Sequence, residues 1–237
     1  MFLFYHIYDK VKSIMMNMES FFEMFKGKAG LWCNANYDSG DLARCAEFVI
    51  SNKVRFLSVT PDAVATVWPW LENEKVKILS RIYIDKKITE KYVSGITKNI
   101  NDSFKHGAHG SQVFIPLDAL DDLVDMTYLV KDDLFFDKDL IIGIHIAEIA
   151  PLDWSKLYRN LQKINAAALM LVLTEDTGDK SDFVGRIYGA LDAWNQNNKF
   201  DLHFLLGADS MRIEQVLRLV EKMQPELIRK IKFFARY

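Results

Sequence analysis

The chain has 237 residues, of which 50% are hydrophobic, 26% charged and 13% aromatic, as in a compact globular domain and unlike a disordered, collagen-like or membrane-spanning protein. A formal charge of -2 provides no overall positive field for binding nucleic acid or an anionic membrane. The two cysteines, Cys33 and Cys45, form no CxxC motif, so we expect no disulfide framework, no metal or other cofactor, and a cytoplasmic location.

Residues 1–27 are apolar and are expected to form one or two helices that pack on the rest of the chain. Large apolar side chains recur between Phe2 and Phe25 at mostly helical spacing. Asp9 and Lys10 interrupt the apolar run too early for a signal peptide or a spanning helix. A helix that lies on a membrane surface or contacts a partner is the alternative interpretation.

After Lys28, short apolar runs alternate with longer amphipathic stretches, which predicts a parallel sheet covered by helices. The predicted strands are 30–35, 54–59, 76–84, 112–117, 140–146, 168–173, 202–206 and 231–236. Helix starts are expected where a residue offers a capping oxygen or a fixed φ: Thr60 with Pro61, Thr89, Asp153, Ser181, and Asp209 or Ser210.

Eight such units predict an α/β fold, a (β/α)8 TIM barrel over residues 28–237, with its chemistry at the carboxyl ends of the strands. Only Tyr237 follows the eighth strand, so no helix after it can cover the sheet there. We expect residues 1–27 to fill that place as an N-terminal helical extension. No linker or composition change indicates another domain.

Three segments carry a resemblance to a known family. Residues 107–120 read GAHGSQVFIPLDAL, residues 56–61 read FLSVTP, and residues 173–178 read LTEDTG. They resemble the G-A-D-E-x-D-x-V-x-x-x-x-A-L, V-C-V-x-P and V-K-T-S-T-G segments of deoxyribose-phosphate aldolases, on the fourth, second and sixth strands of these class I aldolases. The resemblance extends over residues 30–220 and implies an aldolase-type barrel that forms a homodimer.

The residues that carry the family's chemistry are replaced. Thr174 stands in place of the lysine that forms a Schiff base with the substrate, and an alcohol cannot form an imine. Gln112 replaces the aspartate that transfers protons, and Leu205 and Ile141 replace two further lysines. The resemblance therefore implies a barrel without Schiff-base catalysis. Other amines near strand positions are expected to point outward or into loops: Lys77, Lys86, Lys87 and Lys232.

A modified anion site is also expected. The two glycine turns that hold phosphate in the family correspond here to Gly207-Ala208-Asp209-Ser210 and Phe234-Ala235-Arg236-Tyr237. Gly207, the backbone N–H of Ser210 and the guanidinium of Arg236 remain as anion-binding groups. Arg81 is a cation inside an apolar strand, so it either pairs with Glu148 or Asp85 or binds an anionic substrate.

Further candidates lie near the predicted strand ends. Alternation and the resemblance place Gln112, His145 and His203 inside the barrel, where a histidine is either a buried neutral side chain or an acid–base group. Glu148 follows the fifth strand, and Glu175 with Asp176 follows the sixth, so His145 with these carboxylates is a candidate catalytic set. The acidic stretch over 118–139 is interpreted as a solvated surface, with a metal or cationic-partner patch as the alternative.

We predict from these residues a divergent aldolase-type barrel that lacks imine chemistry and binds a small polar or anionic metabolite. One alternative is a carbon–carbon lyase acting on a sugar phosphate or small aldehyde through a relocated lysine. Another is a structural, partner-binding barrel. Trp68 and Trp70 are a possible contact of a homodimer.

Overall fold

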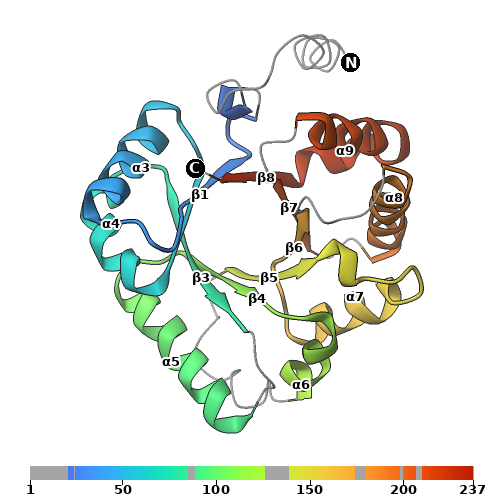
Figure 1. Ribbon diagram of the computed structural model, residues 1–237, viewed down its shortest axis with the longest axis horizontal. Helices are drawn as coiled ribbons and strands as arrows, with labels where there is room; N and C mark the ends of the chain where they lie inside the picture. Colours follow the sequence, from blue (N-terminus) through green and yellow to red (C-terminus); the bar gives the residue numbers. More distant parts are fainter. Residues whose placement is uncertain are drawn as a thin grey trace.

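The computed structural model describes residues 21–23, 25–84, 89–125, 139–173, 180–197, 200–206 and 210–236. Within them, eight parallel strands pair in chain order and close into one barrel, with the helices outside (Figure 1). The predicted (β/α)8 TIM barrel is thereby confirmed. No helix in these ranges is long and apolar enough to span a membrane.

The predicted strands all occur in the structure. They are β1 (Ala29–Trp32), β2 (Phe56–Val59), β3 (Lys77–Tyr83), β4 (Gly110–Phe114), β5 (Asp139–His145), β6 (Ala168–Leu173), β7 (Asp201–Leu206) and β8 (Ile231–Arg236). The α-helices are α3 (Ser39–Ser51), α4 (Val64–Leu71), α5 (Glu90–Lys105), α6 (Leu120–Asp125), α7 (Trp154–Lys163), α8 (Lys180–Asn197) and α9 (Ser210–Met223). Short 3-10 helices are η1 (Pro61–Ala63), η2 (Leu117–Ala119), η4 (Ile146–Glu148) and η5 (Pro225–Arg229).

Alternation along each strand divides its residues between two cores. Outward side chains such as Leu57, Ile142 and Phe204 are fully buried against the helices and belong to the larger core. Inward side chains fill the barrel: Trp32, Phe56, Leu79, Phe114, Ile141, Ala168, Met170, Val172, Leu205 and Phe234. The barrel is therefore a packed core, as expected for this fold.

Two glycines make room for aromatic rings inside the barrel. A Cβ on Gly30 would lie 2.3 Å from the ring of Phe234, and a Cβ on Gly143 would lie 2.3 Å from the ring of Phe114. Real Cβ atoms do not approach a ring so closely, so any other residue at either position would displace the ring.

Local signals explain where the helices begin. Asp38 caps α3: its side chain accepts a hydrogen bond from the N–H of Asp41 at 2.8 Å, and the carboxylate of Asp41 accepts one from the N–H of Asp38 at 3.3 Å. Asp153 is the N-cap residue of α7, as predicted, although its side chain makes no capping hydrogen bond.

Aromatic residues of the leading segment lie on the outside of the barrel near β8. Phe21, Phe22 and Phe25 are buried, and the ring centroid of Phe25 is 4.4 Å from that of Phe233 on the outer face of β8. The ring centroid of Phe22 is 5.3 Å from that of Phe48 of α3. These contacts lie where an eighth helix would pack. Residues 1–20 lie outside the described residues, so the helical extension over them stays a prediction.

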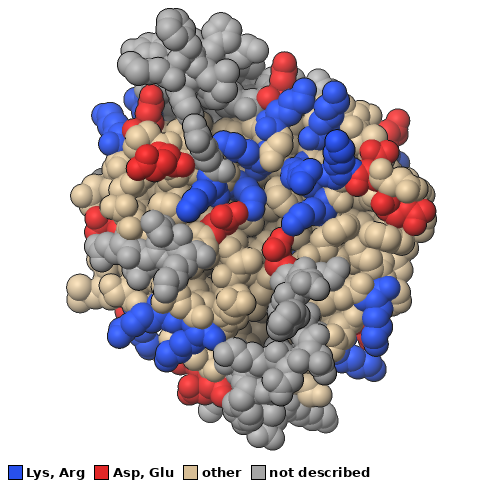
Figure 2. All heavy atoms as spheres, turned by 180° about the vertical axis from the view of Figure 1, so that it is seen from behind, with Lys and Arg blue, Asp and Glu red and all other residues tan. Residues whose placement is uncertain are grey.

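The surface carries both signs of charge. On the end of the molecule seen in Figure 2, lysine and arginine side chains gather near the centre, with acidic side chains between them.

Candidate functional site

The candidate site lies at the carboxyl ends of the strands and centres on Arg81 of β3. Its side chain is on the same face of the strand as Leu79, inside the barrel, and is only 2% exposed. Nη2 donates a hydrogen bond to the carbonyl oxygen of Cys33 at 2.6 Å, and Cζ lies 4.1 Å from the ring centroid of Trp32. The guanidinium is therefore held against an indole ring by one hydrogen bond and a cation–π contact.

The remaining donors of Arg81 have no partner. Nε and Nη1 are both buried and make no hydrogen bond. Burial lowers the pKa of Arg81, and the positive charge of Arg236 acts in the same direction. An ionised group buried without an opposite charge is costly, commonly by several kcal/mol. Among the residues that the structure describes, Arg81 is thus a cation that lacks a counter-ion.

Arg236 and Tyr83 lie beside Arg81. Arg236 is the exposed last residue of β8 and is in register with Trp32 of β1. Tyr83 is the last residue of β3 and is 54% exposed. Burial of the rest of its side chain raises the pKa of the Tyr83 hydroxyl, while Arg81 and Arg236 act in the opposite direction. Two cations and a phenol therefore share this end of the barrel.

Three aromatic rings from neighbouring parts of the sheet meet at the same level, and we call Trp32, Tyr83 and Phe114 the aromatic triad. Ring centroids are 5.0 Å apart for Trp32 and Phe114, 5.1 Å for Tyr83 and Phe114, and 6.5 Å for Trp32 and Tyr83. Trp32 and Phe114 are edge to face, a favourable arrangement. The triad was not predicted from the sequence. The available signal was a bulky aromatic residue within each of three predicted strands.

Gln112 lies below this level and is fully buried. Its Oε1 accepts a hydrogen bond from Oγ of Ser58 at 2.6 Å, and its Nε2 is 3.9 Å from Sδ of Met170. The predicted inward orientation is confirmed by these contacts. Gln112 links β2, β4 and β6 inside the barrel.

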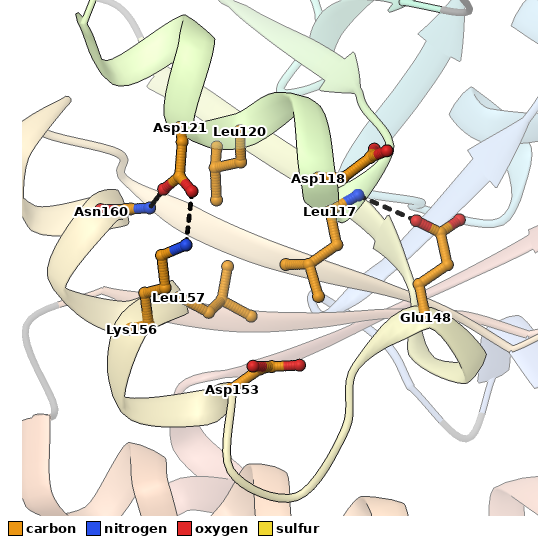
Figure 3. Close-up of a pocket in the computed structure, with 9 residues that line it drawn as sticks. All are labelled: Leu117, Asp118, Leu120, Asp121, Glu148, Asp153, Lys156, Leu157 and Asn160. Atoms are coloured by element: carbon orange, nitrogen blue, oxygen red, sulfur yellow. Dashed lines mark hydrogen bonds and ion pairs between the residues drawn. The ribbon is translucent and has the colours of Figure 1, made fainter.

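His145 and Glu148 point to different places. His145 is the exposed last residue of β5 and faces the barrel mouth, because it is in register with the inward Val172. Glu148 accepts a hydrogen bond from the N–H of Leu117 at 2.9 Å (Figure 3). Within the described ranges, Glu148 bonds neither to His145 nor to Arg81. Of the alternatives for Arg81, an ion pair with Glu148 therefore does not occur among the described residues, and Asp85 lies outside them.

Glu148 instead borders a groove of about 500 Å³ between η2, α6 and α7 (Figure 3). Asp121 of α6 is held there by ion pairing with Lys156 and by a hydrogen bond from Nδ2 of Asn160 at 2.7 Å. These hydrogen bonds lower the pKa of Asp121. Asp121, which belongs to the predicted acidic stretch, is thus bound to neighbouring side chains in this groove. In the described ranges, no three potential ligands lie close enough to hold a metal ion.

Other predicted site residues cannot be placed. Thr174, Glu175, Asp176 and Gly207 lie outside the described residues, as does Asp85. Ser210 is the first residue of α9, which follows β7.

The two described lysines among the amine candidates lie at the opposite, amino-terminal end of the barrel. Lys77 begins β3, two residues before the inward Leu79, and its Nζ is 3.1 Å from Oδ2 of Asp139. Nζ of Lys232 is 2.6 Å from Oδ2 of Asp201 and 5.3 Å from the ring centroid of Phe56, which is inside the barrel. The expectation that both point outward or into loops is wrong. Lys86 and Lys87 lie outside the described residues.

His203 of β7 faces inward, as predicted, and is packed among aromatic rings. Its ring centroid is 6.5 Å from that of Phe56 and 5.6 Å from that of Phe234. Neither ring nitrogen has a hydrogen-bond partner. Burial, and to a lesser degree the charge of Lys232, lower the pKa of His203 well below the usual range. His203 is therefore neutral and has no access to a ligand at the mouth.

The two tryptophans of α4 differ in exposure. Trp70 is 40% exposed, whereas Trp68 is half-buried and packs on Gly107, where a Cβ would lie 2.2 Å from the indole. Of the two, Trp70 is the side chain that remains accessible to a partner.

Comparisons with known proteins show a shared fold without close sequence similarity. No protein-family model matches the chain, and no curated protein has a similar sequence. A candidate deoxyribose-phosphate aldolase from Toxoplasma gondii matches with a TM-score of 0.69 and 11% identity, over 92% of this chain and 91% of that one. Deoxyribose phosphate aldolase from Aeropyrum pernix matches with a TM-score of 0.65 and 12% identity, over 90% and 87%.

A barrel that is named for a different role matches with a similar TM-score. A candidate copper homeostasis protein CutC from Streptococcus agalactiae has a TM-score of 0.61 and 9% identity, over 88% of this chain and 97% of that one. These likenesses establish the TIM-barrel fold, and a barrel of this kind hosts many chemistries.

Proposed function

We propose that this barrel binds a small anionic metabolite at its carboxyl-terminal mouth, with Arg81 and Arg236 as the cationic groups, and that it does not use Schiff-base catalysis. The observation that carries the proposal is the buried guanidinium of Arg81, whose Nε and Nη1 lack partners. An anion would supply the missing charge and accept these hydrogen bonds. Arg236, at the rim of the same end, would add a second favourable charge.

The positions of the two described candidate lysines support the absence of imine chemistry. Catalytic residues of TIM barrels come from the carboxyl ends of the strands. Lys77 and Lys232 are bound to aspartates at the amino-terminal end.

Anion binding is tested by titrating the full chain with inorganic phosphate, sulfate and acetate in a calorimeter. We expect saturable binding of at least one anion, and a loss of about tenfold or more in affinity in Arg81→Met, since a charge-assisted hydrogen bond is worth about 1.5–3 kcal/mol. The matched control is Arg159→Met, at an exposed position on α7, which should bind as the wild type does. Wild-type protein that binds none of these anions at millimolar concentration contradicts the proposal.

The competing lyase function has its own test. The chain is incubated with small aldehydes and with a sugar phosphate in the presence of borohydride, which fixes an imine as a stable secondary amine. Intact mass should remain unchanged. A mass increase that maps to any lysine would establish the relocated-lysine lyase in place of the proposed function.

A further inference from the structure

The surroundings of Arg81 also bear on what kind of anion fits. Among the described residues, the aromatic triad lies beside Arg81 at the barrel mouth. Trp32 and Phe114 are only 5% and 6% exposed, whereas Tyr83 is 54% exposed. Tyr83 is therefore the ring of the triad that a ligand beside Arg81 can contact.

The described residues at the barrel mouth offer few hydrogen-bond partners to a sugar. Ser58 and Gln112 are fully buried and bonded to each other, so their polar groups are already used. Among the described residues, the exposed polar side chains on inward mouth positions are those of Tyr83, His145 and Arg236. At these positions a polyhydroxylated ligand would lose water from several hydroxyl groups without replacing all of those hydrogen bonds.

The geometry of Arg81 is suited to a flat anion. Its guanidinium lies against the indole of Trp32, and the hydrogen bond to Cys33 fixes one nitrogen. Nη2 has a second hydrogen, and its N–H together with that of Nε or Nη1 forms the parallel pair that a planar carboxylate accepts. An aromatic body attached to that carboxylate could then pack against the ring of Tyr83, the accessible ring of the triad, in offset or edge-to-face contact.

Building on the proposed anion site, we propose that the mouth is selective for a small aromatic carboxylate over a sugar phosphate, with the aromatic triad as the specificity-determining element. Arg81 would hold the carboxylate, and Tyr83, the accessible ring, would contact the aromatic body.

The test compares four probes on the full chain by calorimetry: benzoate, acetate, inorganic phosphate and a pentose 5-phosphate. We expect benzoate to bind about tenfold more tightly than acetate, because ring contacts add to the carboxylate interaction, and more tightly than the pentose phosphate. Tyr83→Ala should lower the affinity for benzoate about fivefold and leave that for acetate nearly unchanged.

Tyr188→Ala is the matched control, because Tyr188 of α8 is 53% exposed, almost as much as Tyr83. It should leave the affinity for benzoate unchanged. The melting temperature of each variant establishes that it is folded.

The possible results separate this inference from the function on which it rests. A pentose phosphate or inorganic phosphate that binds more tightly than benzoate overturns the carboxylate preference but leaves the anion site standing. Equal affinities for benzoate and acetate remove the role of the triad. Absence of binding by all four probes overturns both proposals.

Discussion

Gly143 of β5 lies directly against the ring of Phe114 of β4, its neighbour in register: a Cβ on Gly143 would be 2.3 Å from Cε1 of that ring. Because Gly143 has no side chain, β5 leaves room for the ring of Phe114 on β4. Since Phe114 belongs to the aromatic triad, this packing also positions the triad.

Gly143→Ala should destabilise the fold, because the added methyl group forces Phe114 out of its place. Overpacking of this kind costs about 1–3 kcal/mol in the free energy of unfolding. Urea unfolding measures the change. Gly185→Ala is the control: apart from the neighbouring backbone of α8 itself, no atom lies within 4 Å of that Cβ position, so the substitution should be neutral or stabilising. A Gly143→Ala protein as stable as the wild type would contradict the packing described.

Arg81→Met should leave the unliganded protein at least as stable as the wild type. The substitution removes a buried charge with two unpaired nitrogens and keeps a flexible apolar side chain against Trp32. Replacing buried charges with apolar groups is often neutral or stabilising by about 1–4 kcal/mol. Urea unfolding without added anions gives the value, and a loss above about 1 kcal/mol would show that Arg81 is a net stabilising group.

Stability should decrease in mild acid because of His203. Its folded-state pKa is lowered, so the folded protein resists protonation, whereas the unfolded chain takes up a proton below about pH 6.5. Below that pH the unfolded state binds more protons, and the free energy of unfolding falls by about 1.4 kcal/mol per pH unit from this histidine. The loss stops only below the folded-state pKa.

The pH effect is measured by urea unfolding at pH 7.5 and 5.0 in the wild type and in His203→Met. The variant should lose about 2 kcal/mol less than the wild type between the two pH values. Equal losses in both proteins would mean that His203 does not contribute.

Lys232 and Asp201 should be coupled in stability. Asp201→Asn leaves the ammonium group of Lys232 beside the ring of Phe56 without its carboxylate. Because both side chains are partly exposed, we expect a coupling energy of about 0.5–1 kcal/mol, reduced at high salt. A double-mutant cycle with Lys232→Met measures it, and additive effects of the two substitutions would rule out the coupling.

The strands could be predicted well where apolar residues dominate a short segment. The predicted bounds of β6 and β8 coincide with the observed ones. β1 was predicted to continue to Ala35 but ends at Trp32, because the side chain of Asn34 accepts a hydrogen bond from the N–H of Asn36 and turns the chain. β4 begins at Gly110, earlier than predicted, since glycine allows the close approach of Asp139, whose carbonyl oxygen would be 2.7 Å from a Cβ.

The site was less predictable because its groups meet only through the register of the barrel. Arg81 was recognisable as a cation within an apolar strand. Its contact with Trp32 of β1 could not be foreseen, since that contact depends on how far neighbouring strands are staggered. The inward direction of Lys77 follows from alternation along β3, because Leu79, two residues later, lies inside the barrel.

The two ion pairs at the amino-terminal end, Lys77 with Asp139 and Lys232 with Asp201, set a requirement for anyone who wishes to engineer lyase activity into this chain. Freeing either amine would remove an ion pair at the amino-terminal end of the barrel and still leave the nitrogen far from the mouth. A new lysine would have to be introduced nearer the mouth, for instance at Val172, where the apolar interior of the barrel favours the unprotonated amine.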